Sequence, residues 1–296
     1  MAKVLVHLPL NISRAIEEML KDFGREMKQK HGIKLEVENL HKCMAADEKS
    51  KDMRIDNAPD LLVGNANYIL KFAGSNLEEH IRPLPGRFPL RPELAKAGFA
   101  DSRGYFHPFV IVPFAIFYNP NVVREGELPQ VWADLLDASW REKILMPAQH
   151  HMAPKMIQAL IQAYYPEKIA ALRQNMVFDG APINVVNAVD EGRYPLGITN
   201  VTFARVSRNK NISMLWPRDG LFCMPLVMVW NKKADDRLLE IGDYLLSSRV
   251  QEYLALQTFV PVSTAVNIPQ VLIENNFNLI WRGWDDFINV LKGVIG

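Results

Sequence analysis

The chain has 296 residues, 49% of them hydrophobic, so it is long enough to bury a large core and to form two lobes of ordinary domain size. Its 34 basic and 33 acidic residues give a formal net charge of +1. A balanced charge offers no electrostatic footprint for nucleic acid or an anionic membrane. No apolar stretch reaches the roughly 20 residues that a membrane-spanning helix needs. We therefore expect a globular protein with no nucleic-acid partner and no direct membrane insertion.

The N-terminal residues and the cysteines leave the cellular compartment open. Residues 1–8 lack the charged, apolar and small-residue regions of a signal peptide. Two alternatives follow. The chain is a periplasmic or extracellular protein whose signal peptide has been removed from this sequence, or it is a cytoplasmic protein. Cys43 and Cys223 lie far apart and form no metal-ligand spacing. The redox compartment is undecided.

The first hundred residues predict a parallel α/β arrangement. Apolar runs of strand length alternate with apolar residues at helical spacing, which is the pattern of a βαβ unit. A proline- and arginine-rich stretch then follows at 81–107 with little periodicity. We expect strands at 3–8, 33–37 and 61–63, a helix that ends at His31-Gly32, and an exposed helix at 45–57.

Several polar residues follow these strands, where the loops lead into helices. In open parallel sheets, ligands bind outside the carboxyl ends of the strands, at helix N-termini. An equally weighted alternative is that these side chains only cap helices, with Asn11 or Ser13 as the cap of the first one. The first binding candidates are Asn11, Ser13, Gly64, Asn65 and Asn67.

Two apolar runs each carry a proline and end in an asparagine. They extend from Phe109 to Asn119 and from Cys223 to Asn231. Because proline cannot donate to a sheet ladder, we interpret both runs as strands that pass between two sheets. The predicted division places residues 1–112 and 228–296 in the first lobe and residues 113–227 in the second.

The second lobe and the tail repeat the α/β pattern and then become helical. The wide apolar face of the last segment, at 277–291, predicts that the tail docks back on the first lobe. The other expected elements are a capped helix at 128–137, strands at 143–147 and 195–200, helices at 152–165 and 182–191, and tail helices at 235–246 and 249–257. The binding candidates of the second lobe are Gln149, His150, His151, Thr199, Asn200 and Phe203.

Taken in order, these segments resemble the type II periplasmic solute-binding proteins that serve ABC transporters for ferric iron, polyamines, thiamine and small anions. Each segment is degenerate alone, but the ordered set is specific. The resemblance implies two α/β lobes of mostly parallel sheet joined by two hinge strands, with a ligand captured by hinge closure. It rests on Pro59-Asp60-Leu61-Leu62-Val63-Gly64 and on residues 112–119, 128–147, 191–198, 242–251 and 259–262.

The positions at which this sequence differs from the family reduce the number of ligand classes that it suits. Ferric-binding members carry a tyrosine pair after the second-lobe strand, where this chain has Asn200-Val201-Thr202-Phe203. Ferric iron prefers anionic oxygen ligands, so a tyrosine cage is disfavoured. Acidic residues are scarce in the candidate loops, which weakens the polyamine alternative. Amides, hydroxyls and helix N-termini suit a small polar or anionic ligand.

The histidines leave open whether the ligand includes a metal ion. His150 and His151 could cap and pack, contact a polar ligand or ligate a metal, and they are weak metal candidates because no HxxxH spacing supports them. His7 and His107 could join such a site from the first lobe. The sequence therefore leaves it undecided whether the ligand is a metal or a metal complex.

The competing functions are an enzyme and a cytoplasmic ligand sensor on the same two-lobed fold. The chain has no GxSxG, P-loop, GxGxxG or HExxH motif, and no helix-turn-helix segment. We therefore expect a solute-binding protein rather than an enzyme, with no cofactor, acting as a monomer. Its expected partners are the small ligand or ion and an ABC transporter permease.

Overall fold

The computed structural model describes the chain except for residues 41–57, 68–69, 71–76 and 296. The exposed helix predicted at 45–57 and Cys43 lie outside the described residues. The chain divides into two compact units. Unit 1 comprises Met1–Ile111 and Pro225–Ile268, and unit 2 comprises Val112–Met224 and Pro269–Val294.

The sheet of unit 1 is built on three parallel strands. β1 (Ala2–His7) pairs with β2 (Leu35–Asn39) on one side and with β3 (Leu61–Asn65) on the other. The part of β9 (Leu221–Trp230) that belongs to this unit pairs antiparallel with β3. The predicted βαβ pattern is confirmed, but β2 begins two residues later than expected and β3 continues through Asn65.

Helix α1 (Leu10–His31) follows β1 because buried apolar residues recur at helical spacing, among them Ile12, Ile16 and Leu20. It ends where Gly32 adopts the left-handed conformation, with φ of 69°, as the sequence predicts. At the other end the prediction is wrong. Pro9 is the N-cap, so Asn11 and Ser13 lie inside the first turn and cap nothing.

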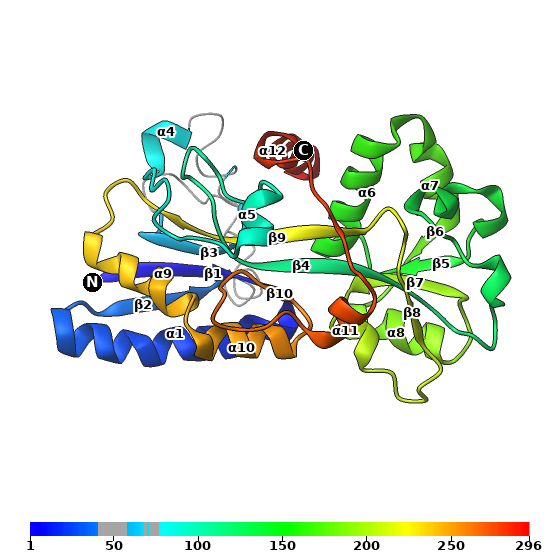
Figure 1. Cartoon of the computed structure of the whole chain (residues 1–296), viewed down its shortest axis with the longest axis horizontal. Helices are drawn as coiled ribbons and strands as arrows, with labels where there is room; N and C mark the ends of the chain where they lie inside the picture. The colour runs from blue at the N-terminus through cyan, green and yellow to red at the C-terminus, as the bar shows by residue number, and fades with distance from the viewer. Residues whose placement is uncertain (41–57, 68–69, 71–76, 296) are drawn as a thin grey trace. The chain divides into compact units, whose positions relative to one another are not determined.

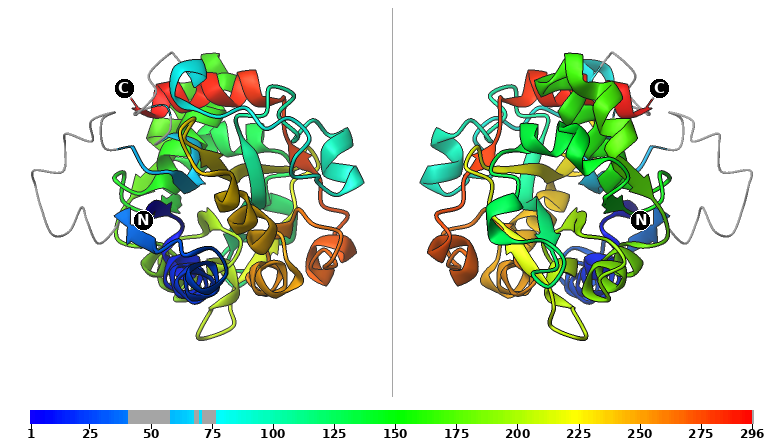
Figure 2. Two further views of the ribbon diagram at one scale, coloured as in Figure 1. Left: turned by 90° about the vertical axis from the view of Figure 1, so that its left-hand side faces the viewer. Right: turned by 90° about the vertical axis from the view of Figure 1, so that its right-hand side faces the viewer.

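The other helices of unit 1 surround this sheet. α10 (Ser248–Leu256) lies beside α1 in Figures 1 and 2, and the Tyr253 hydroxyl donates to the Asn11 carbonyl oxygen at 3.4 Å. β10 (Val260–Pro261) pairs with the first part of β4 (His107–Tyr118). The bounds are α4 Leu77–His80, α5 Pro92–Lys96, a 3-10 helix Asp236–Leu238, α9 Leu239–Leu245, α10 Ser248–Leu256 and β10 Val260–Pro261.

Unit 2 has its own mixed sheet. β5 (Ile144–Met146) pairs parallel with both β6 (Met176–Phe178) and β7 (Leu196–Asn200). β7 and β8 (Ser213–Leu215) pair antiparallel with β4. The helices are α6 Met152–Tyr164, α7 Ile169–Asn175 and α8 Pro182–Asp190, with 3-10 turns at Glu125–Glu127, Trp132–Leu136, Ala138–Trp140, Pro166–Lys168 and Phe203–Arg205. The capped helix expected at 128–137 is thus only a 3-10 turn at Trp132–Leu136.

Two long strands run from one unit into the other. β4 (His107–Tyr118) is buried along its length except for Tyr118, and β9 (Leu221–Trp230) is buried throughout. They coincide with the two proline-bearing runs, and the units divide after Ile111 in β4 and after Met224 in β9. The expected divisions were after residues 112 and 227, so each observed boundary lies slightly earlier.

The C-terminal segment differs from the prediction, because Pro269–Val294 groups with unit 2 and not with unit 1. β11 (Leu279–Ile280) pairs in parallel with Leu221 and Phe222 at the start of β9. The Arg282 guanidinium stacks 3.8 Å above the centroid of the Tyr164 ring of α6. The wide apolar face was identified correctly, but apolarity does not specify which core receives it. The segment also contains α11 (Gln270–Glu274) and α12 (Trp284–Ile295).

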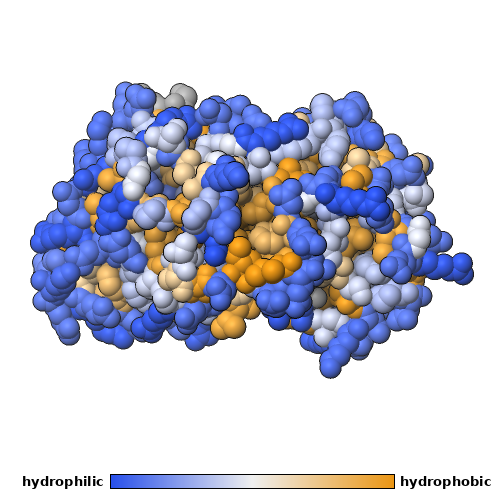
Figure 3. Space-filling model, viewed as in Figure 1, coloured by the Kyte–Doolittle hydropathy of each residue, from blue (hydrophilic) through white to orange (hydrophobic). Residues whose placement is uncertain are grey.

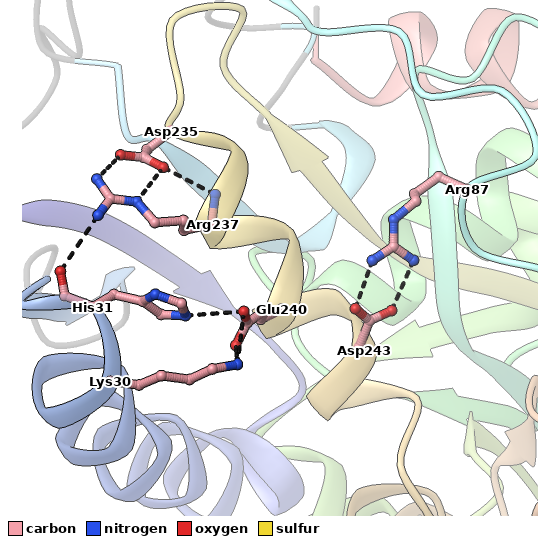
Figure 4. Close-up of polar contacts among 7 residues, drawn as sticks. All are labelled: Lys30, His31, Arg87, Asp235, Arg237, Glu240 and Asp243. Atoms are coloured by element: carbon pink, nitrogen blue, oxygen red, sulfur yellow. Dashed lines mark hydrogen bonds and ion pairs between the residues drawn. The ribbon is translucent and has the colours of Figure 1, made fainter.

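Polar contacts tie the C-terminal end of α1 to α9 (Figure 4). Lys30 and His31 both bind the Glu240 carboxylate, at 3.0 and 2.9 Å. Arg237 donates to the His31 carbonyl oxygen, and Arg87 forms a two-fold contact with the Asp243 carboxylate. The hydrogen bonds from Lys30 and His31 hold the pKa of Glu240 below its usual value. Partial burial of the carboxylate opposes them but is outweighed.

We expect Glu240→Ala to lower the free energy of unfolding by less than about 1 kcal/mol, because the Glu240 side chain is 35% exposed and water screens the pair. Urea unfolding at low and high salt measures this, and the loss shrinks as salt rises. Glu18→Ala, which breaks the more exposed pair with Arg14, is the control. A loss from Glu240→Ala that is large and independent of salt contradicts this account.

Hydrophilic side chains cover most of the outer margin of each unit on the face shown in Figure 3, as expected when the apolar sides of strands and helices are packed inward. Among the residues that the structure describes, no helix is both long enough and apolar enough to cross a membrane.

Candidate functional site

The carboxyl ends of β1, β2 and β3 meet at one edge of the unit 1 sheet, because the three strands are parallel. Their last residues are His7, Asn39 and Asn65, which are all polar and at most 6% exposed. Asn65 Nδ2 lies 3.2 Å from His7 Nδ1. With the amide as donor, neutral His7 carries its proton on Nε2. The structure thus brings His7 and Asn65 together.

Polar atoms at this edge lack hydrogen-bond partners within the described protein. They are Oδ1 of Asn65, Oδ1 of Asn67 and both amide atoms of Asn11. Asn65 and Asn67 are each only 4% exposed. A buried polar atom without a partner costs about 1–3 kcal/mol, so a cluster of them is a sign of a ligand site. The unpaired oxygens call for a partner that donates hydrogen bonds.

The N-terminus of α1 begins three residues after His7. No side chain caps this helix, and its first turn holds no acidic residue. The Pro9 carbonyl oxygen accepts from the N–H groups of Ile12 and Ser13, both at 3.0 Å. Uncapped N–H groups and the helix dipole favour an anionic group here. The edge therefore offers acceptors from the amides beside a site of positive potential.

Ser13 has a structural partner. Its Oγ accepts from Asn39 Nδ2 at 2.9 Å, and the same amide donates to Glu17 at 2.9 Å. This buried contact fastens α1 to the end of β2. The sequence did not single out Asn39, because the second strand was expected to end at residue 37. The polar residue at position 39, two positions after the expected end of the strand, was the signal that could have identified it.

Gly64 contributes backbone rather than a contact group. Its φ is +146°, and a Cβ atom built on it would lie 2.0 Å from the His7 carbonyl oxygen. β3 can approach β1 here only because Gly64 has no side chain. Its role is to place Asn65 beside His7.

The parallel strands of unit 2 form a second such edge. The loops after β5 and β6 are joined by a hydrogen bond of 2.9 Å from the Ala148 N–H to the Gly180 carbonyl oxygen. Gln149 and His150 are exposed, and the rings of His150 and His151 lie 4.2 Å apart. His151 is the N-cap of α6 but makes no side-chain capping bond. The N-terminus of α6, like that of α1, therefore has no side-chain cap.

The candidate residues at the end of β7 and just after it differ in their contacts. Thr199 is 1% exposed, and its hydroxyl oxygen has no partner in the described protein. Asn200 Oδ1 instead accepts from the Thr202 N–H at 3.2 Å, a local turn contact. Phe203 is half-buried and begins the 3-10 helix Phe203–Arg205. Thr199 therefore has the stronger sign of a ligand contact.

His107 lies at the other end of the unit 1 sheet from His7. Its ring packs edge-on against Phe88 at 5.2 Å and Trp230 at 5.7 Å. Trp230 pairs with Leu61, the first residue of β3, whereas Asn65 is the last. The suggestion that His7 and His107 share a site is therefore wrong. Burial lowers the pKa of His107 to about 4, against a hydrogen bond with Gly104 that raises it.

A metal centre finds no support within the described residues, where no three His, Cys, Asp or Glu side chains gather closely enough to hold an ion. Cys223 is buried, and this burial raises the pKa of its thiol strongly. The thiol therefore stays protonated and packs like an apolar side chain. Among the described residues, both edges present hydrogen-bonding groups and a helix N-terminus without a side-chain cap.

Comparison with solved structures shows the same fold. The ferric binding protein of Campylobacter jejuni is 16% identical, with a TM-score of 0.75 over 100% of this chain and 97% of that one. The apo ferric ion-binding protein A of Pasteurella haemolytica is 16% identical, with a TM-score of 0.73 over 99% and 95%. A protein described as an ABC transporter from Clostridium perfringens is 18% identical, with a TM-score of 0.68 over 100% and 98%.

These likenesses confirm the type II periplasmic-binding-protein fold expected from the sequence. No curated protein sequence matches the chain. The model of one family, described as bacterial extracellular solute-binding protein, matches residues 56–290. That range covers most of the chain and contains β3, both long strands and the loops after β5 and β7. The chain belongs to this bacterial family of extracellular solute-binding proteins.

Proposed function

We propose that this solute-binding protein captures a small polar organic solute that carries an anionic group together with hydroxyl or amino donors. One observation supports the proposal above the others: the buried Oδ1 atoms of Asn65 and Asn67 lack partners in the described protein, and they lie at or just after the carboxyl end of a strand, at the same sheet edge as the uncapped N-terminus of α1. A ligand with both functions would pair the amide oxygens and place its negative charge at the helix end. Citrate and glutamate have this combination.

The names of several structural neighbours point to ferric iron as a ligand, but the residues of this chain do not suit the bare ion. The neighbours of known structure include proteins named as ferric ion-binding. Here the segment Asn200-Val201-Thr202-Phe203 offers neutral oxygens and an apolar ring, and Asn65 offers an amide in place of a carboxylate. Ferric iron prefers anionic oxygen ligands. We therefore assign this chain a polar organic ligand.

The family supports a role in transport outside the cytoplasmic membrane. In this proposal the chain acts in the periplasm or at the cell exterior, as a monomer that hands its ligand to an ABC transporter permease and carries out no catalysis. The neighbour described as an ABC transporter supports the transport role. Co-purification with a permease encoded beside it, dependent on ligand, tests the hand-over.

A thermal-shift screen tests the ligand class. The panel contains citrate, glutamate, phosphate, thiamine, spermidine, Fe³⁺, Ni²⁺ and Zn²⁺. A ligand at about 100 times its Kd stabilises the folded state by about 2.7 kcal/mol, which is readily visible as a rise in Tm. We expect citrate or glutamate to raise the Tm. A rise with spermidine alone or a bare metal alone contradicts the proposal, as does turnover of any compound that produces no rise.

Asn65→Ala should weaken binding of the stabilising acid by about tenfold, the equivalent of one hydrogen bond. Asn65→Asp should weaken it further, because the added carboxylate repels an anion. Isothermal titration calorimetry measures both. Asn275→Ala, at the exposed residue that follows α11, is the control and should bind like wild type. Tighter binding by Asn65→Asp would show that the ligand is cationic.

A further inference from the structure

The segment between β7 and β8, residues 201–212, has a buried anchor outside the segment itself. Asp190 is the last residue of α8 and is 2% exposed. Its Oδ1 accepts from Ser207 Oγ at 2.6 Å and from the Asn211 N–H at 2.9 Å. Its Oδ2 accepts from the Asn209 N–H at 2.7 Å. One carboxylate thus holds three points of the segment.

The position of this carboxylate is unfavourable without those donors. A negative charge at the C-terminal end of a helix opposes the helix dipole, and burial alone raises the pKa of Asp190. The hydrogen bonds from Ser207 and from the backbone of residues 208, 209 and 211 outweigh burial and hold this pKa below its usual value. The charge is therefore stable here only while the segment is wrapped around it.

The helix end is itself fixed to the sheet. Asn119, directly after β4, donates from Nδ2 to the Val189 carbonyl oxygen at 2.8 Å and to that of Asp190 at 3.4 Å. Asn211 Nδ2 also donates to the Asp190 carbonyl oxygen at 3.4 Å. A continuous set of hydrogen bonds runs from the end of β4 through Asp190 to the segment.

We propose that Asp190 is a positioning residue for solute binding: it holds residues 201–211 so that Thr202 and Phe203 are presented beside Thr199 at the carboxyl edge of unit 2. This inference rests on the proposed function, since it assigns these residues to the ligand. Both carboxylate oxygens of Asp190 accept hydrogen bonds from the segment, so this role needs no contact between Asp190 and the ligand. Its effect on affinity is indirect, through the conformation of the loop.

Unit 1 supplies a matched control. Asp101 is 9% exposed and accepts from the backbone N–H groups of Arg103, Tyr105 and Phe106, at 3.1, 3.0 and 3.1 Å. It organises a turn in the same way, but that turn leads into His107 at the end of the sheet remote from His7. Asp101→Asn therefore reports the cost of breaking such a turn without touching the proposed ligand site.

The experiment compares Asp190→Asn, Ser207→Ala and Asp101→Asn in the full-length protein. An amide keeps one acceptor oxygen but turns a donor toward an N–H, so Asp190→Asn should speed hydrogen exchange of the amides at 202–211 by about tenfold while β7 stays protected. Its affinity for citrate should fall by about tenfold. Ser207→Ala, which keeps the carboxylate, should have a smaller effect of the same kind and serves if Asp190→Asn does not fold.

Asp101→Asn, at a similar loss of Tm, should leave citrate affinity within about twofold of wild type because the sites are independent. Unchanged exchange at 202–211 in both unit 2 variants overturns the inference, as does an equal loss of citrate affinity in Asp101→Asn. If wild type binds neither citrate nor glutamate, the proposed ligand class fails. The exchange measurement then still decides whether Asp190 positions the segment.

Discussion

Gly64→Ala should lower the free energy of unfolding by about 3 kcal/mol or more, because the new Cβ has no place to go. Built on the present backbone it lies 2.0 Å from the His7 carbonyl oxygen and 2.7 Å from the carbonyl carbon. Both are main-chain atoms of β1, so no rotation of a side chain relieves the overlap. The φ of +146° adds strain for any residue with a Cβ.

The same substitution should also abolish binding of the stabilising acid. The strands must separate at the point where His7 pairs with Gly64, and Asn65 is the next residue. A shift of the order of an ångström there removes the contact between the Asn65 amide and His7. Calorimetric titration of the folded variant, below its lowered Tm, measures this loss.

Gly126→Ala is the matched control, since a Cβ there meets no atom within 4 Å. Urea unfolding of both variants beside wild type gives the difference. We expect Gly126→Ala to change the free energy of unfolding by less than about 0.5 kcal/mol. If Gly64→Ala unfolds within about 1 kcal/mol of wild type, β1 and β3 do not approach as closely as described.

His107 should make the protein less stable in acid. Burial lowers the pKa of its ring from 6.5 to about 4, so the folded state holds the neutral form. The nearby Asp101 carboxylate favours the charged ring, and the Arg87 guanidinium opposes it. The contribution of the neutral ring is complete above the unfolded pKa, and stability falls as the pH drops from about 6.5 toward 4.

The expected loss over this range is about 3 kcal/mol, since each pKa unit of difference corresponds to about 1.4 kcal/mol. His107→Phe should remove most of this pH dependence while keeping an aromatic ring against Phe88 and Trp230. The Nε2 atom of His107 has no partner in the described protein, so the hydrogen bond that the substitution removes at neutral pH is the one with Gly104. Urea unfolding at several pH values between 7.5 and 4.5 gives the slope for each variant.

The exposed His150 provides the comparison for this titration. We expect His150→Gln to lose as much stability as wild type over this pH range, because the side chain that it replaces lies at the surface. If His107→Phe keeps the full pH dependence of wild type, other groups cause the loss in acid and the burial of His107 does not.

The two-lobed α/β fold was predictable because its signals are local. Strand-length apolar runs, the periodicity of α1 and the αL glycine at its end all act between residues close in sequence. The two prolines, Pro113 and Pro225, marked the strands that run between the units. The ordered segments then sufficed to name the family correctly.

The details of the site depended on contacts that the sequence does not encode locally. Asn11 and Ser13 were placed as helix caps, but the helix begins one residue after Pro9 and takes Ser13 into a contact with Asn39. His107 was offered as a partner of His7, although the two lie at opposite ends of one sheet. Polar residues of the right type could be named from sequence, but their neighbours could not.

The sequence by itself determined the class of fold, the order of its elements, the two long strands and a neutral, amide-rich set of candidate residues. Only the tertiary structure decided which of these meet: Asn65 with His7, Asp190 with the segment after β7, and the C-terminal segment with unit 2. The physical reason is that hydrophobic periodicity specifies which face of an element is buried. The partner that buries it, and the polar atoms left unpaired beside it, are chosen by pairing of strands distant in sequence.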